Sequence, residues 1–206
     1  MVVFQSGFAA NAGTVAAVLT KDDVVISDEL NHASIIDGAR LSRAAIKVFP
    51  HKDVDAARKI LTDLPAGQRK LLITDGVFSM DGDLGALPEL CALAEEFGCI
   101  MMVDDAHASG VFGSNGRGTI DHFGMHGRVD IQVGTLSKAI GALGGYVAGS
   151  TDADRVPVSP RAPVLCSRRR IRRRSRPRAS RRSTSSSRSR RSSSGCGTTR
   201  ASSRRA

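Results

Sequence analysis

Lys138 stands in a setting that suits carbonyl chemistry. It closes the run Gly134-Thr-Leu-Ser-Lys138, and a glycine-rich stretch follows it up to position 146. Small neighbours at a strand's end leave room beside the amine for a bulky planar ring. Partial burial and a neighbouring cation could lower its pKa so that it attacks an aldehyde at neutral pH. Thr135 could hydrogen-bond a phosphate. A surface lysine beside a glycine-rich turn is the alternative that this motif leaves open.

Two acidic residues and a histidine follow another strand pattern, in Met102-Val-Asp-Asp-Ala-His107. A carboxylate at that sheet edge, from Asp104, could keep a pyridine nitrogen protonated, which makes the ring of pyridoxal phosphate (PLP) an electron sink. His107 could reach the phenolic oxygen of that ring. An N-cap aspartate and a structural histidine are the alternative. We favour the functional interpretation because a strand that ends in two Asp and a His is unusual.

Three further signals are weak when taken singly. His32, in Asn31-His-Ala-Ser34, could stack on a ring and act on substrate protons, but a histidine before a helix is often a cap. Gly7 and Phe8 precede a predicted helix, whose N-terminal N–H groups suit a phosphate. Ser79 follows a buried strand pattern in a polar turn and could be only turn chemistry.

The elements that position these residues alternate between strand and helix. Such alternation predicts an α/β fold with a doubly wound, mostly parallel sheet, whose ligands sit at the carboxyl ends of the strands. Short apolar runs typical of strands buried on both faces lie at Val24–Ser27, Ala45–Phe49, Leu71–Thr74, Ile100–Val103, Ile131–Gly134 and Tyr146–Ala148. Helical patterns lie at Ala9–Leu19, Ser34–Leu41, Val54–Leu64 and Leu87–Phe97, with Asp53 as a cap of the third and Pro88 in the first turn of the fourth.

Charge divides the chain into two parts. Positions 1–150 hold 12 Lys and Arg against 18 Asp and Glu, whereas positions 151–206 hold 18 Arg, no Lys and 2 Asp. The net charge of +10 therefore averages a core of −6 and a segment of +16. That segment also holds 14 Ser and little apolar surface to offset its ordering entropy, so we predict that it is a disordered tail.

The remaining composition fits a globular protein of a reducing compartment. Hydrophobic residues make up 41% of the chain, and no apolar run approaches the ~20 residues of a membrane span. We predict no signal peptide, no metal site and a cytoplasmic location. The four cysteines lack metal-ligand spacing, and the apolar surroundings of Cys91 and Cys99 favour buried free thiols over a disulfide.

Taken together, the motifs resemble those of the α-oxoamine synthase family of fold-type I PLP enzymes. The resemblance covers nearly all of positions 4–150. It is carried by Ser6-Gly-Phe-Ala-Ala-Asn11, Ser27-Asp-Glu-Leu-Asn-His-Ala-Ser34, Thr74-Asp-Gly-Val-Phe-Ser-Met-Asp-Gly-Asp83, Val103-Asp-Asp-Ala-His107 and Gly134-Thr-Leu-Ser-Lys138.

The resemblance implies a role for each candidate residue. Catalysis would depend on Lys138 as the Schiff-base lysine, on Asp104 at the pyridine nitrogen and on His32, stacked on the ring beside the substrate. The cofactor would also be contacted by Gly7, Phe8, Ser79, His107 and Thr135. Positions 1–150 would thus be the PLP-binding core of an incomplete large domain.

The resemblance also implies an acyltransferase that joins an amino acid to an acyl-CoA as a homodimer. The sequence around Asn31-His-Ala-Ser34 and Asp75 favours glycine C-acetyltransferase (2-amino-3-ketobutyrate CoA ligase). That enzyme makes 2-amino-3-oxobutyrate from glycine and acetyl-CoA. The alternative is 8-amino-7-oxononanoate synthase of biotin synthesis, which uses alanine and pimeloyl-CoA. A different class of protein stays open: a non-catalytic PLP-domain fragment with a polyanion-binding Arg/Ser tail. We expect no membrane partner, and nucleic acid only through non-specific contact with that tail.

Family members extend well before position 4 and well past position 150, where they carry a smaller domain. The Arg-rich, Lys-free composition of positions 151–206 is typical of a GC-rich gene read out of frame. The run Val164-Leu-Cys-Ser-Arg-Arg-Arg-Ile-Arg-Arg173 can be encoded so that another frame reads Phe-Ser-Thr-Ser-His-Pro-Pro, a family motif. We therefore hypothesise a frameshift after about position 150, and a poor catalyst.

Overall fold

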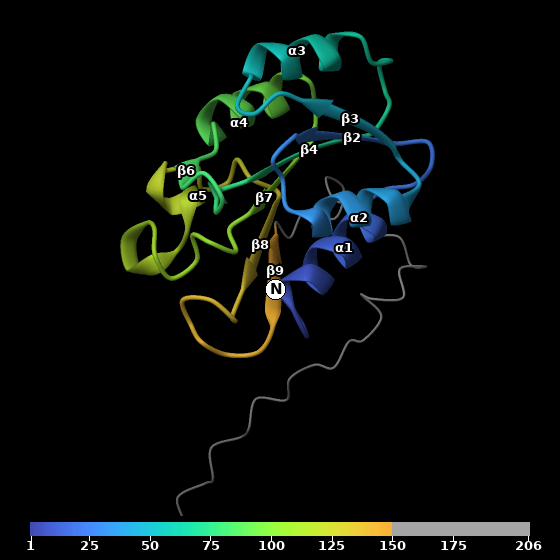
Figure 1. Cartoon of the computed structure of the whole chain (residues 1–206). Coiled ribbons are helices and arrows are strands. Elements are labelled where there is room, and N and C mark those ends of the chain that lie inside the picture. Colours follow the sequence, from blue (N-terminus) through green and yellow to red (C-terminus); the bar gives the residue numbers. More distant parts are fainter. Residues whose placement is uncertain (150–206) are drawn as a thin grey trace, which may run out of the picture. The chain divides into compact units, whose positions relative to one another are not determined.

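The computed structural model describes residues 1–149, and the predictions for 151–206 lie outside them (Figure 1). The described residues form a seven-stranded sheet in the order β1-β9-β8-β7-β4-β2-β3, and a two-stranded hairpin, β5-β6. Strands β8, β7, β4, β2 and β3 run parallel to one another, whereas β9 and β1 are antiparallel to their neighbours. The doubly wound, mostly parallel sheet is therefore confirmed.

The elements have the following bounds. The strands are β1 (Val2–Phe4), β2 (Val24–Asp28), β3 (Ala45–Phe49), β4 (Lys70–Asp75), β5 (Val77–Phe78), β6 (Asp83–Leu84), β7 (Ile100–Asp104), β8 (Ile131–Thr135) and β9 (Gly145–Gly149). The helices are α1 (Gly7–Val18), α2 (Ala33–Ser42), α3 (Val54–Thr62), α4 (Leu87–Glu96), a short 3-10 turn (Ser114–Gly116) and α5 (Thr119–His122).

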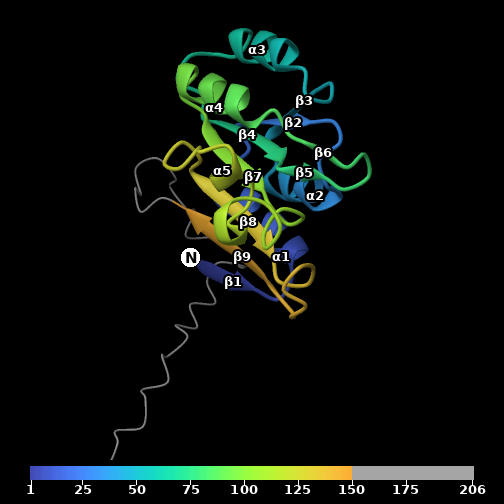
Figure 2. The same cartoon turned by 90° about the vertical axis from the view of Figure 1, so that its left-hand side faces the viewer.

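Both faces of the central strands β2, β4 and β7 are buried, which explains their unbroken apolar runs. The edge strand β3 is largely exposed, so the prediction that it is buried on both faces was wrong, because no neighbouring strand covers its outer edge. Side chains alternate along a strand, so Leu71 and Ile73 of β4 join a core with α1 and α2, while Leu72 joins a second core with α3 and α4. Figures 1 and 2 show α1 and α2 together on one side of the sheet and α3 with α4 on the other. The two cores fix the strand ends that carry the polar residues.

The predicted strands and long helices are all present, within a few residues at their ends. Asp53 caps α3 by accepting a hydrogen bond from the Ala56 N–H, and Pro88 lies in the first turn of α4. The sequence analysis missed β1, the β5-β6 hairpin and α5, because segments of two to four residues are too short to show a period.

Two other predictions can be compared with the described residues. Cys91 and Cys99 are buried and free, as expected. Within residues 1–149, no helix has the length and apolar character that a membrane crossing requires.

Candidate active site

A cavity of about 190 Å³ opens at the carboxyl ends of β4, β7 and β8, beside the N-termini of α1 and α2. Parallel strands that end at one edge bring polar residues distant in sequence into one place. The cavity is lined by Ser6, Gly7, Phe8, Asn11, His32, Ser34, Asp75, Asp104, Ala106, His107, Thr135, Ser137 and Lys138. Seven of the eight predicted site residues are among them, and Ser79 is the exception.

Lys138 follows β8 at the cavity wall. Partial burial lowers the pKa of its amine below the ordinary value, although the carboxylates of Asp104 and Asp75 act in the opposite direction. Burial, and not the neighbouring cation that the sequence suggested, therefore lowers this pKa. A lowered pKa increases the fraction of neutral amine, which is the nucleophilic form.

A hydrogen-bond network joins Asp104 to His32 through helix α1. The Asn11 side-chain amide donates to Asp104 Oδ2 at 2.5 Å and to Ser34 Oγ at 3.0 Å. Ser34 Oγ lies 2.7 Å from His32 Nδ1, and the same nitrogen accepts from the Ser34 N–H at 3.1 Å. Because Nδ1 accepts, the neutral His32 ring carries its proton on Nε2. His32 therefore caps α2 and lines the cavity, so the two interpretations of this residue are compatible.

Asp104 is buried, and both of its carboxylate oxygens have partners. Oδ1 accepts from the Ala106 N–H at 2.9 Å, in addition to the bond from Asn11 to Oδ2. Each carboxylate oxygen can accept more than one hydrogen bond, so the carboxylate can still face a protonated ring nitrogen. The neighbouring Asp105 is turned away from the cavity and accepts from Thr119 and Gln132.

Asp75 adds a second buried carboxyl beside Asp104. The two residues are register partners at the ends of β4 and β7. Burial first, and then the nearby charge of Asp104, raise the pKa of Asp75 to about 8. Its Oδ1 atom is buried without a hydrogen-bond partner and belongs to a side chain that lines the cavity. An orphaned polar atom of this kind is expected where a ligand supplies the missing partner.

The cavity lining also includes hydroxyl groups next to the start of α1. Ser6 caps this helix by accepting from the Ala9 N–H at 3.1 Å, and Thr135 Oγ1 lies 2.9 Å from Ser137 Oγ. A Cβ atom on Gly7 would lie 3.2 Å from Thr135 Cβ, so a side chain there would crowd this wall. First-turn N–H groups have no acceptor within their helix, and together with the hydroxyls they suit a phosphate.

His107 lies in the cavity wall after the Asp104-Asp105 pair. Burial first, and then the charge of Lys138, lower the pKa of His107, so its ring is neutral at pH 7. A neutral imidazole can both donate and accept a hydrogen bond.

Ser79 lies elsewhere, at the exposed turn of the β5-β6 hairpin. Its predicted contact with the cofactor stays a prediction. Several lining residues had no individual role assigned from the sequence, although Asn11 lies in the run Ser6-Gly-Phe-Ala-Ala-Asn11 that carries the family resemblance. The lining residues without an assigned role were Ser6, Asn11, Ser34, Asp75, Ala106 and Ser137.

The cavity fits PLP on chemical grounds. A lysine amine suits its aldehyde, the buried carboxylate of Asp104 suits its ring nitrogen, and the hydroxyls and helix N-terminus suit its phosphate. The orphaned Oδ1 of Asp75 and the crowding at Gly7 indicate a site shaped for a ligand rather than a solvent-filled gap.

Comparisons with known proteins agree with this chemistry. The family model described as aminotransferase class I and II matches residues 1–190. The chain is 64% identical over 151 residues to the 8-amino-7-oxononanoate synthase of Alkaliphilus metalliredigens and 58% identical over 149 residues to 8-amino-7-oxononanoate synthase 1 of Bacillus subtilis. These matches cover 73% and 72% of this chain but 38% of each relative, so the chain spans well under half of their length.

Solved structures give the same result. A serine palmitoyltransferase from S. paucimobilis with a bound PLP–myriocin aldimine has a TM-score of 0.72 and 39% identity, over 74% of this chain and 38% of that one. The 8-amino-7-oxononanoate synthase of Francisella tularensis has a TM-score of 0.61 and 33% identity, over 75% and 44%. The chain therefore belongs to the aminotransferase class I and II family of PLP-dependent enzymes, as a partial large domain of the α-oxoamine synthase type.

Proposed function

We propose that this chain is part of an 8-amino-7-oxononanoate synthase, which joins alanine to pimeloyl-CoA. The observation that carries this proposal is the 64% identity over 151 residues to a relative of that name. The sequence analysis favoured glycine C-acetyltransferase, and the similar proteins support the alternative instead.

We assign the following roles to the residues of the cavity. PLP, when bound, withdraws electrons from the substrate so that a proton can leave its Cα atom. Asp104 would hold the ring nitrogen in its protonated form, because a buried carboxylate favours a positive charge nearby. His32 would stack on the ring, held by its hydrogen bonds to Ser34.

Lys138 would hold the cofactor and, when released from it, take the Cα proton of the amino acid at Nζ. Its lowered pKa supports both tasks, since each needs a neutral amine. Thr135, Ser6 and the first turn of α1 would bind the phosphate, and His107 would contact the ring oxygen. We further propose cytoplasmic location and a homodimer for the whole enzyme, by analogy with the family.

The first experiment is to mix the purified 206-residue chain with PLP and reduce it with borohydride. We expect a visible absorption band and a stable adduct mapped to Lys138 by mass spectrometry, both lost in Lys138→Ala. A band that persists in Lys138→Ala, or no band at all, would count against the proposed site.

The substrate is tested separately. The loaded chain should change its absorption spectrum at lower concentrations of alanine than of glycine. The opposite order would favour glycine C-acetyltransferase. If the chain does not bind PLP but binds RNA in a salt-sensitive way, the non-catalytic alternative is favoured instead.

A further inference from the structure

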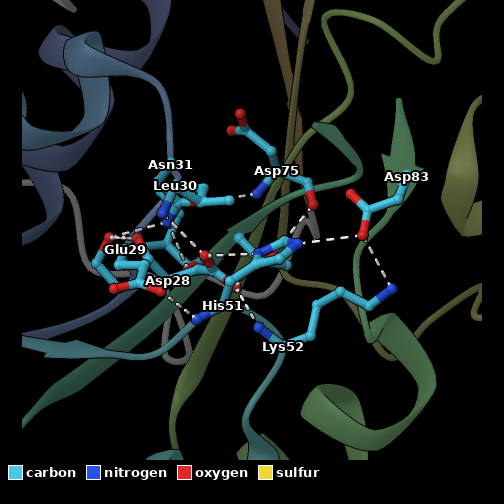
Figure 3. Close-up of polar contacts among 11 residues, drawn as sticks. Asp28, Glu29, Leu30, Asn31, His51, Lys52, Asp75 and Asp83 are labelled. Carbon is cyan, nitrogen blue, oxygen red and sulfur yellow. Dashed lines mark hydrogen bonds and ion pairs between the residues drawn. The ribbon is translucent and has the colours of Figure 1, made fainter. Parts of the chain in front are cut away.

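A histidine outside the cavity is held between two carboxylates from different elements (Figure 3). His51 follows β3, and its Nδ1 lies 3.1 and 3.2 Å from the two carboxylate oxygens of Asp28 at the end of β2. Its Nε2 lies 3.1 Å from Asp83 Oδ2 on β6. One ring thus joins the main sheet to the β5-β6 hairpin.

The surroundings of His51 favour its doubly protonated form. Both ring nitrogens face carboxylate oxygens, and only an imidazolium can donate to both sides at once. Partial burial disfavours the charged ring, but the hydrogen bonds to Asp28 and Asp83 outweigh this effect and raise its pKa. Lys52 donates to Asp83 at 3.1 Å, and Glu29 accepts from the His51 backbone N–H at 2.9 Å. Among the described residues, the titratable groups that contact His51 are therefore Asp28, Glu29 and Asp83, and Lys52 reaches the cluster through Asp83.

Through Asp28, His51 is connected to residues beside the cavity. The buried carboxylate of Asp28 also accepts from the Leu30 and Lys52 N–H groups, each at 3.0 Å. These bonds fix the tight turn between β2 and α2. Asn31, the next residue, donates to the Ile73 carbonyl at 2.9 Å and accepts from the Asp75 N–H at 2.8 Å. The turn therefore ends in a residue tied to β4, directly before His32.

Through Phe78 and Asp83, His51 also contacts the β5-β6 hairpin. Phe78 of β5 packs edge-on against the His51 ring, with 4.4 Å between ring centroids. Asp83 of β6 is paired in register with Phe78. Two strands of two residues each have few hydrogen bonds of their own, and an isolated short hairpin is marginally stable. The contacts with His51 therefore supply an anchor for the segment whose turn carries Ser79.

We propose that His51 is a positioning residue for the cofactor site. It clamps the 28–32 turn, so that His32 is held in the cavity wall, and it anchors the β5-β6 hairpin, whose turn carries Ser79. This inference rests on the proposed function. His51 does not line the cavity, so it would act through Asp28 and Asp83.

The test compares His51→Gln with His126→Gln in the full chain. His126 also pairs with an aspartate, Asp121 of α5, but far along the chain from the clamp and with an exposed ring, so it is a matched control. Glutamine can reach one carboxylate and cannot carry charge. We expect His51→Gln to raise the dissociation constant of PLP about tenfold, as expected for losing a charge-assisted hydrogen bond, and His126→Gln to leave it unchanged.

Two readouts separate positioning from general destabilisation. Amide exchange should accelerate in residues 30–32 and 77–84 of His51→Gln and not in the sheet strands β4 and β7. The difference in PLP affinity between wild type and His51→Gln should also shrink as pH rises through the His51 titration, seen by NMR above the ordinary histidine pKa of about 6.5. Equal PLP affinity with unchanged exchange in both segments would overturn the proposal.

Asp83→Asn weakens only the contact between His51 and the hairpin. This variant keeps the proposal testable if His51→Gln does not fold. We expect faster exchange in 77–84 while residues 30–32 stay protected. Unchanged exchange in the hairpin, or a wild-type His51 that titrates below the ordinary value, would refute the clamp. Failure of wild type to bind PLP would refute the proposed function instead, and the exchange and titration results would still decide the role of His51.

Discussion

The buried carboxyl of Asp75 should make the cofactor-free chain less stable as pH rises from about 4 to about 8. Its pKa is raised from an ordinary 3.8 to about 8 in the folded chain. Between these values the folded state binds a proton that the unfolded state has lost. The free energy of unfolding then falls with pH, by at most about 1.4 kcal/mol per pH unit.

The total loss is bounded by the size of this shift. A shift of about four pKa units corresponds to at most about 6 kcal/mol. We therefore expect a loss of a few kcal/mol, a large part of the 5–15 kcal/mol typical of a domain. Below pH 4 the contribution is fully present, and above pH 8 it is gone.

Asp75→Asn removes this titration without a large change in size. Urea unfolding of wild type and variant at pH 4.5 to 8.5 measures the slope, which should be flatter in Asp75→Asn. Asp121→Asn is the control, because hydrogen bonds from His126 and Ser114 lower the pKa of Asp121, so its contribution is lost only at acidic pH. Parallel pH profiles for wild type and Asp75→Asn would refute the reasoning. A constant offset between them would not, because an asparagine can change stability equally at every pH.

Three further predictions concern packing and the cavity. Leu72→Ala should lower the free energy of unfolding by about 2–5 kcal/mol, measured by urea denaturation, because Leu72 is fully buried against α3 and α4. Gly38→Ala should cost about 1–3 kcal/mol in the same assay, since its Cβ would come within 2.9 Å of the α1 backbone. Asn11→Ala should weaken PLP binding by about 1–3 kcal/mol in an absorbance titration, because Asp104 and Ser34 each lose a donor; an unchanged affinity would exclude Asn11 from the site.

The sequence by itself determined the sheet and the chemical character of its edge. Strands buried on both faces give short apolar runs in the sequence, so β2, β4, β7 and β8 were predicted from those runs alone. Because parallel strands end at one edge, the residues that follow them could be grouped before any contact was known. Lys138, Asp104 and His32 were found in this way.

Only the tertiary structure decided which polar groups touch and which charges they carry. Asn11 lies 93 positions from Asp104, and His51 lies 32 positions from Asp83, so neither contact leaves a local pattern in the sequence. The raised pKa of Asp75 depends on burial and on the charge of Asp104, its register partner on the adjacent strand β7. The position of Ser79, exposed and outside the cavity, depends on how the eight-residue β5-β6 hairpin packs. Local spacing sets the secondary structure, but electrostatics depends on distance in space, and that distance is fixed by packing.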